Sequence, residues 1–597
     1  MAFIGIDLGT SGLRALLIDD NGQSIGSTSY NYPLSQPKTG WFEQNPADWI
    51  TALESAMLEL SVKYPNFAYV RGIGVTGHMH GATLLDGAGA VIRPCILWND
   101  TRSAKEALKL DQTDKVRQLS GNIVFSGFTA PKLAWLQKNE SNNFKRIAKV
   151  LLPAAYLNYY LTGDYVSDMS DSSGTAWLDT GRRQWSDYLL RVSNMRLDQM
   201  PRLIEGNAKA GELRLELIKK WGLSAPVYVA GGAGDNAAAA CGIGVLREGQ
   251  SFVSLGTSGV ILAARNDYVP AFKTAVHTFC HAIPHHWYQM GVMLSATGSL
   301  NWLSLLTGKE PTELTKALGL KLQAPGKIQF IPYLSGERTP HNDAAVRGGF
   351  LGLSANTSTE DITHAVLSGV AFGLRDSFEE LQVAGVKFDK LIAIGGGTDS
   401  HYWCELIATV LGVPLLLPKN GDFGAALGAA RLAFCATTGA NPVEIMTPPV
   451  IATEITPNIQ YKNDYDEKEF NRRLTVTLEH IKNKYDLGLP LDSSVNCEFE
   501  NKSKHKIDYS VSGEAFLTKP NNTTFMIRDI IKKITKIKPQ LSTTGGTSDA
   551  RFIRKIAPCL EFGLVGKTMH KVDEAVSLSD LKKLTLIYSN ILQNYFK

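Results

Sequence analysis

The chain has 597 residues, 44% hydrophobic and 20% charged, which is enough for several domains and ordinary for a soluble globular protein. Its seven cysteines are scattered, odd in number and never spaced as CxxC, which argues against a disulfide framework or zinc ribbon and fits a reducing compartment. The net charge of +4 arises in residues 486–597, which contain 17 Lys and Arg against 12 Asp and Glu. Because these basic residues alternate with apolar ones, we expect an amphipathic helix with a lysine face and no nucleic-acid partner.

No segment predicts export or a membrane span. The start, MAFIGIDLGT, has no basic region, and Asp7 interrupts its apolar run. The most apolar stretches, residues 227–245 and 423–436, contain Asp235 and Arg431 and are rich in Gly and Ala. We therefore expect a cytoplasmic protein without a membrane partner.

The first predicted unit in chain order is repeated about 250 residues later. Residues 3–25, FIGIDLGTSGLRALLIDDNGQSI, predict a strand, a tight turn, a second strand and a further turn. Residues 251–267, SFVSLGTSGVILAARND, have the same order of parts, and the pentapeptide Leu-Gly-Thr-Ser-Gly occurs at 8–12 and at 255–259. Two copies of one unit predict a duplicated domain with a cleft between its halves.

The segments that follow each repeat alternate between strands and helices. Strands are predicted at VRGIGVTG, APVYVAGG and KLIAIGG, and helices at PADWITALESAMLELSVKY, EDITHAVLSGVAFGLRDSFEELQVAG, SHYWCELIATVLG and DEKEFNRRLTVTLEHIKNKY. This alternation predicts an α/β fold with mixed sheets. Residues 486–506 are polar and weakly patterned, so we interpret them as a linker, after which residues 507–597 form a separate segment.

Asp7 stands where the first strand meets the first Gly-Thr-Ser turn. Successive backbone N–H groups in such a turn can bind an anion, and Thr10 and Ser11 add hydroxyl donors. A carboxylate beside a phosphate is suited to hydrated magnesium. A single such turn could be a hairpin with an incidental Asp, but two copies favour a phosphate site.

Two further Gly-rich turns complete the predicted chemistry. Gly395, Gly396 and Gly397 lead from a strand to a helix and would let an adenosine approach the backbone. Asp235 opens an Ala-rich helix after VAGGAG, where it could accept a proton from a sugar hydroxyl, with Asn236 beside it. Asp is also a favoured helix cap, and the residues alone leave these two interpretations open.

Two loops are candidates for binding a sugar. The loop His78-Met79-His80-Gly81 has two histidines at i and i+2, but no third ligand stands near them for zinc. ILWNDTR supplies Trp98, Asn99 and Asp100, an aromatic and amide set typical of sugar sites. A core tryptophan with polar surface neighbours is the alternative.

The ordered motifs resemble those of the FGGY carbohydrate kinases, and among them the xylulokinases. The motifs are IGIDLGTSG, GHMHGA, ILWNDTR, GFTAPKLAWLQ, GGAGDNA, SLGTSGV, YLSGERTPH and IGGGTDSHYW. The resemblance covers residues 1–485 and implies two actin-like, ribonuclease-H-like ATPase domains, 1–247 for sugar and the first phosphate turn and 248–485 for ATP. It implies ATP-dependent phosphorylation of D-xylulose, with a small-molecule sugar as partner and a homodimer left open.

The same resemblance assigns roles to the candidate residues. It implies that Asp235 is the catalytic base and that Asp7 holds Mg²⁺ through water. The expected sugar contacts are Met79, His80, Asp235 and Asn236, to which the loop pattern adds Trp98 and Asp100. The expected ATP contacts are Thr10, Ser11, Gly256, Thr257, Ser258, Gly395, Gly396 and Gly397.

The tail, residues 507–597, resembles the C-terminal part of succinyl-diaminopimelate desuccinylase, a two-zinc enzyme of the M20 family. The motifs are DYSVSGEAFLT, IKPQLSTTGGTSDARFI and VGKTMHKVDEAVSLSDLKKL, and His570 matches the family's last zinc ligand. The other ligands and the catalytic glutamate have no counterpart in the chain, so we expect an inactive fused fragment without zinc. The alternatives are a bifunctional enzyme, another FGGY sugar or polyol kinase, and a non-catalytic actin-like nucleotide-binding protein.

Overall fold

The computed structural model describes residues 1–224, 226–272, 274–343, 346–419, 424–469, 472, 522–537, 539 and 578–595. The chain divides into two compact units, Met1–Thr477 and Leu478–Lys597. In the second unit the described residues form α18 (Asn522–Thr535) and α20 (Leu578–Tyr595). The predicted linker at 486–506 and His570 lie outside the described residues. Within the described ranges, every helix is too short or too polar to span a lipid bilayer.

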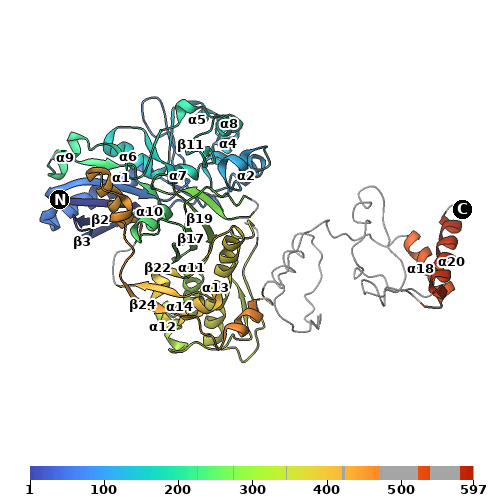
Figure 1. Ribbon diagram of the computed structural model, residues 1–597. Coiled ribbons are helices and arrows are strands. Elements are labelled where there is room, and N and C mark those ends of the chain that lie inside the picture. Colours follow the sequence, from blue (N-terminus) through green and yellow to red (C-terminus); the bar gives the residue numbers. More distant parts are fainter. Residues whose placement is uncertain are drawn as a thin grey trace. The chain divides into compact units, whose positions relative to one another are not determined.

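The first half of the first unit is built on a seven-stranded sheet (Figure 1). Its order is β13-β14-β5-β1-β2-β3, with β15 paired to β5; β1 is antiparallel to β2 and parallel to β5. The strands are β1 (Ala2–Leu8), β2 (Gly12–Asp19), β3 (Ser24–Asn31), β5 (Val70–Gly77), β13 (Lys209–Glu212), β14 (Tyr228–Ala230) and β15 (Ala233–Gly234).

The second half has a second seven-stranded sheet in which the same arrangement recurs. Its order is β18-β19-β17-β16-β22-β23-β24, and β16 is antiparallel to β17 and parallel to β22. The order β14-β5-β1-β2-β3 therefore matches β23-β22-β16-β17-β19, which confirms the duplicated α/β domain predicted from the repeated pentapeptide. The strands are β16 (Ser251–Leu255), β17 (Gly259–Arg265), β18 (His277–Cys280), β19 (Trp287–Met293), β22 (Leu391–Ile394), β23 (Leu415–Pro418) and β24 (Ile451–Ile455).

Short strand pairs and helices surround the two sheets. The pairs are β4 (Glu43–Gln44) with β7 (Cys95–Ile96), β6 (Thr83–Leu85) with β8 (Lys149–Leu151), β9 (Val166–Asp168) with β12 (Arg202–Ile204), β10 (Leu178–Asp179) with β11 (Gln184–Trp185), and β20 (Gln329–Ile331) with β21 (Gly349–Leu351). The helices of the first half are α1 (Pro46–Lys63), α2 (Ala104–Asp111), α3 (Val116–Ser120), α4 (Thr129–Asn139), α5 (Ser141–Arg146), α6 (Pro153–Thr162), α7 (Met169–Ser173), α8 (Asp187–Val192), α9 (Leu215–Trp221) and α10 (Asp235–Gly242). Those of the second half are α11 (Thr297–Thr307), α12 (Pro311–Ala317), α13 (Thr359–Val383), α14 (His401–Leu411), α15 (Ala425–Thr438) and α16 (Pro442–Ile445).

Helix α1 shows how the local sequence sets an element. The side chain of Asn45 accepts a hydrogen bond from the N–H of Ala47 at 3.2 Å, and Pro46 occupies the first turn, where its missing N–H costs nothing. Trp49, Leu53 and Leu60 belong to the buried stripe of the helix, which packs on the N-terminal sheet.

Helix α15 follows β23 of the second sheet in sequence but packs on the first sheet, where the orange helix lies against the blue strands in Figure 1. Glycines make this contact close: a Cβ on Gly5 would lie 1.8 Å from the carbonyl oxygen of Ala426. A Cβ on Gly428 would lie 1.8 Å from the carbonyl oxygen of Ala238 in α10. The two halves are therefore joined through helix backbones in direct contact.

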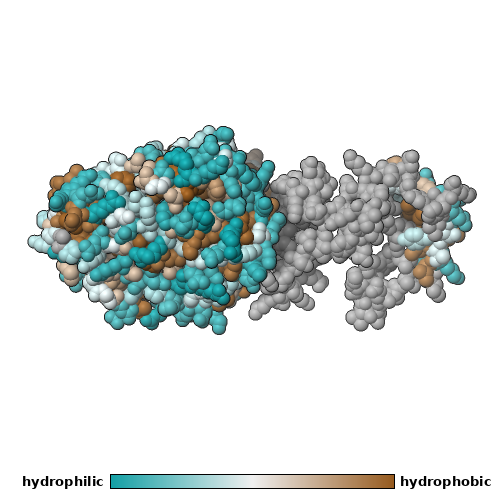
Figure 2. Space-filling view, turned by 90° about the horizontal axis from the view of Figure 1, so that it is seen from above, coloured by the Kyte–Doolittle hydropathy of each residue, from teal (hydrophilic) through white to brown (hydrophobic). Residues whose placement is uncertain are grey.

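Separate hydrophobic cores lie against the two sheets, and a third joins α4 and α10 to β18 and β19. On the face of the first unit seen in Figure 2, hydrophilic side chains predominate and hydrophobic ones form small separate groups. The chemistry must therefore be sought where strand ends gather polar side chains.

Candidate functional site

Three strand ends of the N-terminal sheet meet at one edge. Leu8 at the end of β1 and Gly234 at the end of β15 are both paired in parallel with Gly77 at the end of β5. The carboxyl ends of parallel strands lie together, which is where open α/β sheets bind ligands. This register brings Asp7 and Asp235 close enough that the Asp235 charge raises the pKa of Asp7.

Asp235 is the first residue of α10 but does not cap it. The N-cap is Gly234, and Asp235 Oδ1 accepts hydrogen bonds from the N–H and the side-chain amide of Asn236 at 2.7 and 2.9 Å. Burial raises the pKa of Asp235 to about 6, against the lowering effects of Asn236 and of the Arg338 guanidinium. A carboxyl group that titrates near neutral pH is suited to accept a proton.

Asp7 lies on β1, opposite Arg14 of β2. Burial and the nearby Asp235 raise the pKa of Asp7 to about 7, and Arg14 acts in the opposite direction. A bound divalent cation would stabilise the ionised form of such a carboxylate, so the site fits Mg²⁺. Over the described ranges, no three His, Cys, Asp or Glu side chains gather as a metal site, so an ion here would take its other ligands from water and phosphate.

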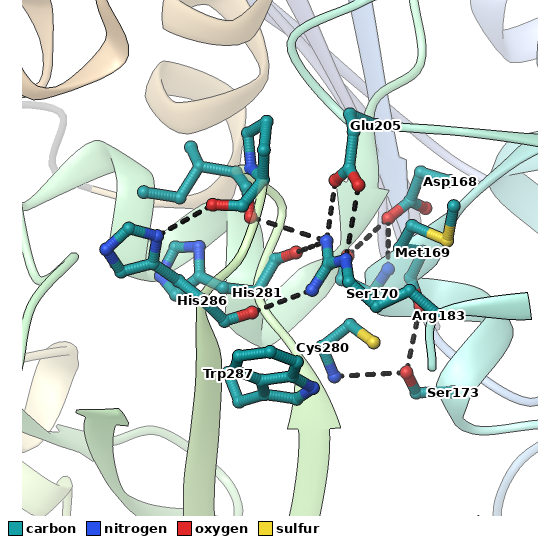
Figure 3. Close-up of polar contacts among 12 residues, drawn as sticks. Asp168, Met169, Ser170, Ser173, Arg183, Glu205, Cys280, His281, His286 and Trp287 are labelled. Atoms are coloured by element: carbon teal, nitrogen blue, oxygen red, sulfur yellow. Dashed lines mark hydrogen bonds and ion pairs between the residues drawn. The ribbon is translucent and has the colours of Figure 1, made fainter. Parts of the chain in front are cut away.

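The turn before Asp235 is fixed by α7. Asp168 caps this helix by accepting the N–H of Ser170 at 2.6 Å (Figure 3). The Ser170 Oγ accepts in turn the N–H of Gly234 at 3.1 Å. The residue that precedes Asp235 therefore has a buried polar anchor.

A second set of contacts ties this region to the loop between β18 and β19 (Figure 3). Arg183 donates to both oxygens of Glu205 at 2.6 and 3.1 Å, and to the carbonyl oxygens of His281 at 3.2 Å and His286 at 2.8 Å. The N–H of Cys280 in β18 also donates to Ser173 Oγ in α7 at 3.0 Å, so the second half of the unit contacts the helix that carries Ser170.

The first Gly-Thr-Ser turn is braced from the N-terminal half. Its ends are joined by a bond from the Gly9 N–H to the Gly12 carbonyl oxygen at 2.9 Å. The side chain of Gln44 donates to the Thr10 carbonyl oxygen at 2.6 Å, and the indole N–H of Trp98 donates to the Thr10 hydroxyl at 3.0 Å. Ser11 is exposed at the tip. Trp98, predicted as a sugar contact, thus orients the predicted phosphate turn.

The second Gly-Thr-Ser turn, residues 256–258, lies beside the third Gly-rich loop. Gly395 has φ 95°, and a Cβ there would lie 2.7 Å from the carbonyl oxygen of Leu255, so the position requires glycine. The N–H of Thr297 in α11 donates to the Gly256 carbonyl oxygen at 2.9 Å. Gly395 and Gly396 are exposed. The predicted ATP residues of the second half are therefore brought together.

Met79 lies against the residue before Asp235, and His80 lies against Gly174 and Phe128. A Cβ on Gly234 would lie 2.9 Å from Met79 Cγ, which places Met79 against the residue before Asp235. His80 Nδ1 lies 2.7 Å from the carbonyl oxygen of Gly174, and its ring stacks on Phe128 at 4.7 Å between centroids. Burial holds the pKa of His80 well below its usual range, so the ring is neutral at physiological pH.

Asp100, predicted as a sugar contact, lies in a buried hydrogen-bonded ion pair. Its side chain is fully buried and accepts the N–H of Phe42 at 2.7 Å. The guanidinium of Arg102 donates to both of its oxygens at 2.7–3.0 Å. Arg102 also lies over the ring of Trp41 at 3.9 Å. Asp100 therefore stabilises the loop that carries Trp98.

Two basic residues of this region are absent from the predicted site residues: Lys132 beside His80 and Arg338, which acts on Asp235. The buried Lys132 donates from Nζ to the carbonyl oxygens of His80 at 2.8 Å and Gly127 at 2.7 Å, and burial lowers its pKa to about 7. Arg338, from the second half, acts electrostatically on Asp235. Both stand in motifs of the family resemblance, GFTAPKLAWLQ and YLSGERTPH, but the sequence does not reveal which loop each side chain contacts.

The arrangement combines two turns able to bind phosphate, a carboxylate that fits magnesium and a second carboxylate that titrates near neutral pH. Such a set can move a phosphoryl group onto a hydroxyl that the second carboxylate deprotonates. Comparison with known families agrees. The N-terminal domain of the FGGY family of carbohydrate kinases matches residues 2–242, and the C-terminal domain of the same family matches residues 251–437.

Individual relatives are similar over most of their own length. The chain is 44% identical to the xylulose kinase of Klebsiella pneumoniae over 436 residues, which is 73% of this chain and 90% of the relative. It is 43% identical to the xylulose kinase of Escherichia coli K12 over 442 residues, 74% of this chain and 90% of the relative. A crystal structure described as a "xyloylose kinase" from Brucella ovis superposes with a TM-score of 0.78 at 52% identity, over 80% of this chain and 99% of that one.

Proposed function

The chain belongs to the FGGY family of carbohydrate kinases, and from this premise we propose that it transfers the γ-phosphoryl group of ATP to D-xylulose, giving D-xylulose 5-phosphate and ADP. The observation that carries the proposal is that two carboxylates, Asp7 and Asp235, lie near each other at one edge of the sheet, beside the first phosphate turn. The names of the most similar relatives support D-xylulose as the acceptor.

We infer the following roles from the geometry. The sugar hydroxyl oxygen forms a bond to the γ-phosphorus while the bond from that phosphorus to the ADP oxygen breaks. Asp235 takes the hydroxyl proton, and Asn236 orients its carboxylate through the bonds of 2.7 and 2.9 Å. Met79 and His80 form the sugar side of the site. Bound Mg²⁺, held through water by Asp7, would supply positive charge to the phosphate oxygens.

The two Gly-Thr-Ser turns and residues 395–397 are the proposed seat of ATP. Exposed backbone at Gly395 and Gly396 supports contact with the adenosine, and the hydroxyls of Thr10 and Ser11 support contact with the phosphates. The described cysteines are all free and buried, which together with the need for ATP supports a reducing, cytoplasmic setting. We propose no zinc-dependent reaction for the tail.

The proposal is tested by sugar-dependent ADP release from purified chain. We expect D-xylulose to give the highest kcat/KM in a panel of pentuloses, hexuloses, glycerol and gluconate, because the most similar relatives are xylulose kinases. A higher kcat/KM with another acceptor would mean that D-xylulose is not the preferred substrate, but the chain would still be a sugar or polyol kinase. Nucleotide-dependent sedimentation without ADP release from any acceptor would favour an actin-like binding protein, and hydrolysis of succinyl-diaminopimelate would assign activity to the tail.

The pH dependence of kcat/KM for the sugar reports the protonation of Asp235. Since its pKa is raised to about 6, the carboxylate is protonated and inactive as a base below that pH. We expect kcat/KM to fall about tenfold per pH unit below pH 6 and to level off above it. The groups that interact electrostatically with Asp235 include Arg338, Asp7, Asp171 and Tyr288.

An Asn236→Ala variant provides the matched comparison for this fall in kcat/KM at low pH, the acidic limb of the pH profile. The hydrogen bonds of Asn236 lower the pKa of Asp235, so loss of the side-chain bond moves the acidic limb to higher pH. Rates are measured at saturating Mg²⁺ and ATP. An acidic limb that stays in place in Asn236→Ala, or that lies near pH 4 in the unmodified protein, would contradict the assignment of the base.

A further inference from the structure

One cation near the base has no partner that explains its burial. Arg338 is partly buried, and burial lowers the pKa of its guanidinium to about 10, so it remains charged at neutral pH. Across the part of the chain that the structure describes, the guanidinium of Arg338 forms no hydrogen bond and no ion pair within 4 Å. A desolvated cation is costly unless something pairs with it.

Other buried arginines of the chain show what a structural role looks like here. Arg102 pairs with Asp100 at 2.7 Å, and Arg183 pairs with Glu205 at 2.6 Å. Arg472 pairs with Glu469 at 2.7 Å and also with Asp376. Each therefore has a carboxylate that compensates its desolvation. Arg338 has no such carboxylate partner, so a bound ligand would explain why its cation is buried.

The backbone that carries Arg338 is firmly held. Glu337 Oε1 accepts the N–H of Leu294 at 2.9 Å and the N–H of Arg338 at 2.7 Å. Thr339 is tied to β19 by two bonds to Val292, both 3.0 Å long. The loop is thus fixed on both sides of Arg338, and its side chain is presented from a rigid support.

The side chain points across to the first half of the unit. Its guanidinium carbon lies 5.4 Å from the ring centroid of Phe125, and a Cβ on Gly127 would lie 3.6 Å from Nη2. Lys132 donates to the same Gly127 at 2.7 Å and to the carbonyl oxygen of His80 at 2.8 Å. Arg338 therefore adjoins the loops that form the sugar side of the site.

Charge effects give the same location. The positive charge of Arg338 acts on Asp235, His80 and Lys132, whereas the cation that acts on Asp7 is Arg14. Arg338 thus lies close to Asp235 and to the loop of His80. A planar guanidinium in this place can donate two parallel hydrogen bonds to neighbouring oxygens of a polyol or ketose.

We propose that Arg338 is a substrate-binding residue whose guanidinium donates hydrogen bonds to oxygens of the sugar held between it and Asp235. The assignment rests on the proposed sugar kinase function. In this assignment the bound sugar is the missing partner of the cation, because its oxygens accept the hydrogen bonds that water would otherwise accept. It also makes sugar recognition depend on both halves of the unit, because the base and Met79 come from the first half and Arg338 from the second.

The test compares Arg338→Ala and Arg338→Lys with the unmodified chain in sugar-dependent ADP release. Loss of charge-assisted hydrogen bonds raises KM for D-xylulose about 10- to 100-fold in Arg338→Ala. Arg338→Lys keeps the charge but loses the fork, so its KM lies between the two. KM for ATP stays within about threefold in both variants, because the ATP turns are not touched. The exposed Arg247, changed to Ala, is the matched control and leaves both constants unchanged.

Deoxy sugars identify the contacted oxygen. D-xylulose analogues lacking the hydroxyl at carbon 1, 3 or 4 are assayed with both proteins, and for the contacted oxygen the losses from the analogue and from Arg338→Ala are less than multiplicative. ATP binding by calorimetry on Arg338→Ala confirms that the variant is folded.

The outcomes separate this assignment from the function on which it rests. An unmodified chain that releases no ADP with any acceptor overturns both. An active chain whose Arg338→Ala variant keeps its KM for the sugar overturns the assignment alone, as does a variant in which only KM for ATP rises. Lower thermal stability with both constants unchanged would show that the residue is structural.

Discussion

Replacing Asp235 by Ala lowers kcat for sugar phosphorylation by about 10²- to 10⁴-fold, the range for loss of a general base. The physical reason is that burial raises the pKa of this carboxylate to about 6 and that it is the proposed acceptor of the hydroxyl proton. Asp235→Asn keeps the shape of the side chain but cannot take the proton, so its kcat falls by a similar factor. The measurement is steady-state ADP release with D-xylulose at pH 8, where Asp235 is ionised in the unmodified chain.

Stability distinguishes a catalytic role from a structural one. Because the folded protein raises the pKa of Asp235, the ionised carboxylate lowers the stability of the folded state above pH 6. Both variants should therefore unfold at the same temperature as the unmodified chain or at a higher one. The exposed Asp198, changed to Ala, serves as control and keeps full activity. Near-normal turnover of Asp235→Ala would sink the proposed mechanism.

The parts of the site that the sequence could predict are local ones. The Leu-Gly-Thr-Ser-Gly turns and the Gly395–Gly397 loop depend on backbone freedom within a few residues, and such requirements are written in the sequence. Their repetition also predicted the duplicated sheets, whose strand orders match. Asp235 was predicted at its strand-to-helix turn, but only the structure gives the hydrogen bonds that its carboxylate accepts from Asn236.

The parts that escaped prediction depend on contacts between distant segments. Arg338 acts on Asp235 from about 100 residues further along the chain, and the Trp98 indole reaches Thr10 across 88 residues. The residue type of Asp100 suggested a sugar ligand, but only the structure shows that Arg102 donates to both oxygens of its carboxylate. The periodicity of the sequence does not predict which distant loop a side chain will contact. The same holds for α15, which returns to pack on the first sheet.

The end of the kinase fold is likewise defined by long-range contacts. Residues 462–469 are helical, and the fully buried Tyr465 donates from its hydroxyl to the Gln323 carbonyl oxygen at 2.9 Å and lies 2.9 Å from His364 Nε2. Arg472 continues this attachment to α13 and to Tyr333. These contacts join residues 96 to 142 positions apart in the chain. We therefore expect that the kinase needs the chain through Arg472, whereas the tail that follows residue 485 takes no part in the reaction.

Replacing Arg472 by Ala should destabilise the folded kinase by about 3–5 kcal/mol, the usual effect of removing one partner of a buried ion pair. Arg472 is 1% exposed, and its guanidinium donates to both oxygens of Glu469 at 2.7 and 2.9 Å, to the Tyr333 hydroxyl at 2.9 Å and to Asp376. The variant leaves two buried carboxylates without this cation, and Lys cannot reproduce its fork.

The measurement is the free energy of unfolding in urea, or the rate of thermal inactivation where unfolding is irreversible. Lys462, whose side chain is 41% exposed and pairs with Asp466 at 3.2 Å, is the matched control, and Lys462→Ala should cost less than about 1 kcal/mol. A chain that ends at residue 485 keeps Arg472 and should phosphorylate D-xylulose like the full chain. One that ends at residue 460 loses Tyr465 and Arg472 together and should not fold. Equal unfolding free energies of Arg472→Ala and Lys462→Ala would contradict this expectation. The buried arginine network would then contribute no more than an exposed ion pair, and the fold would be complete before this helix.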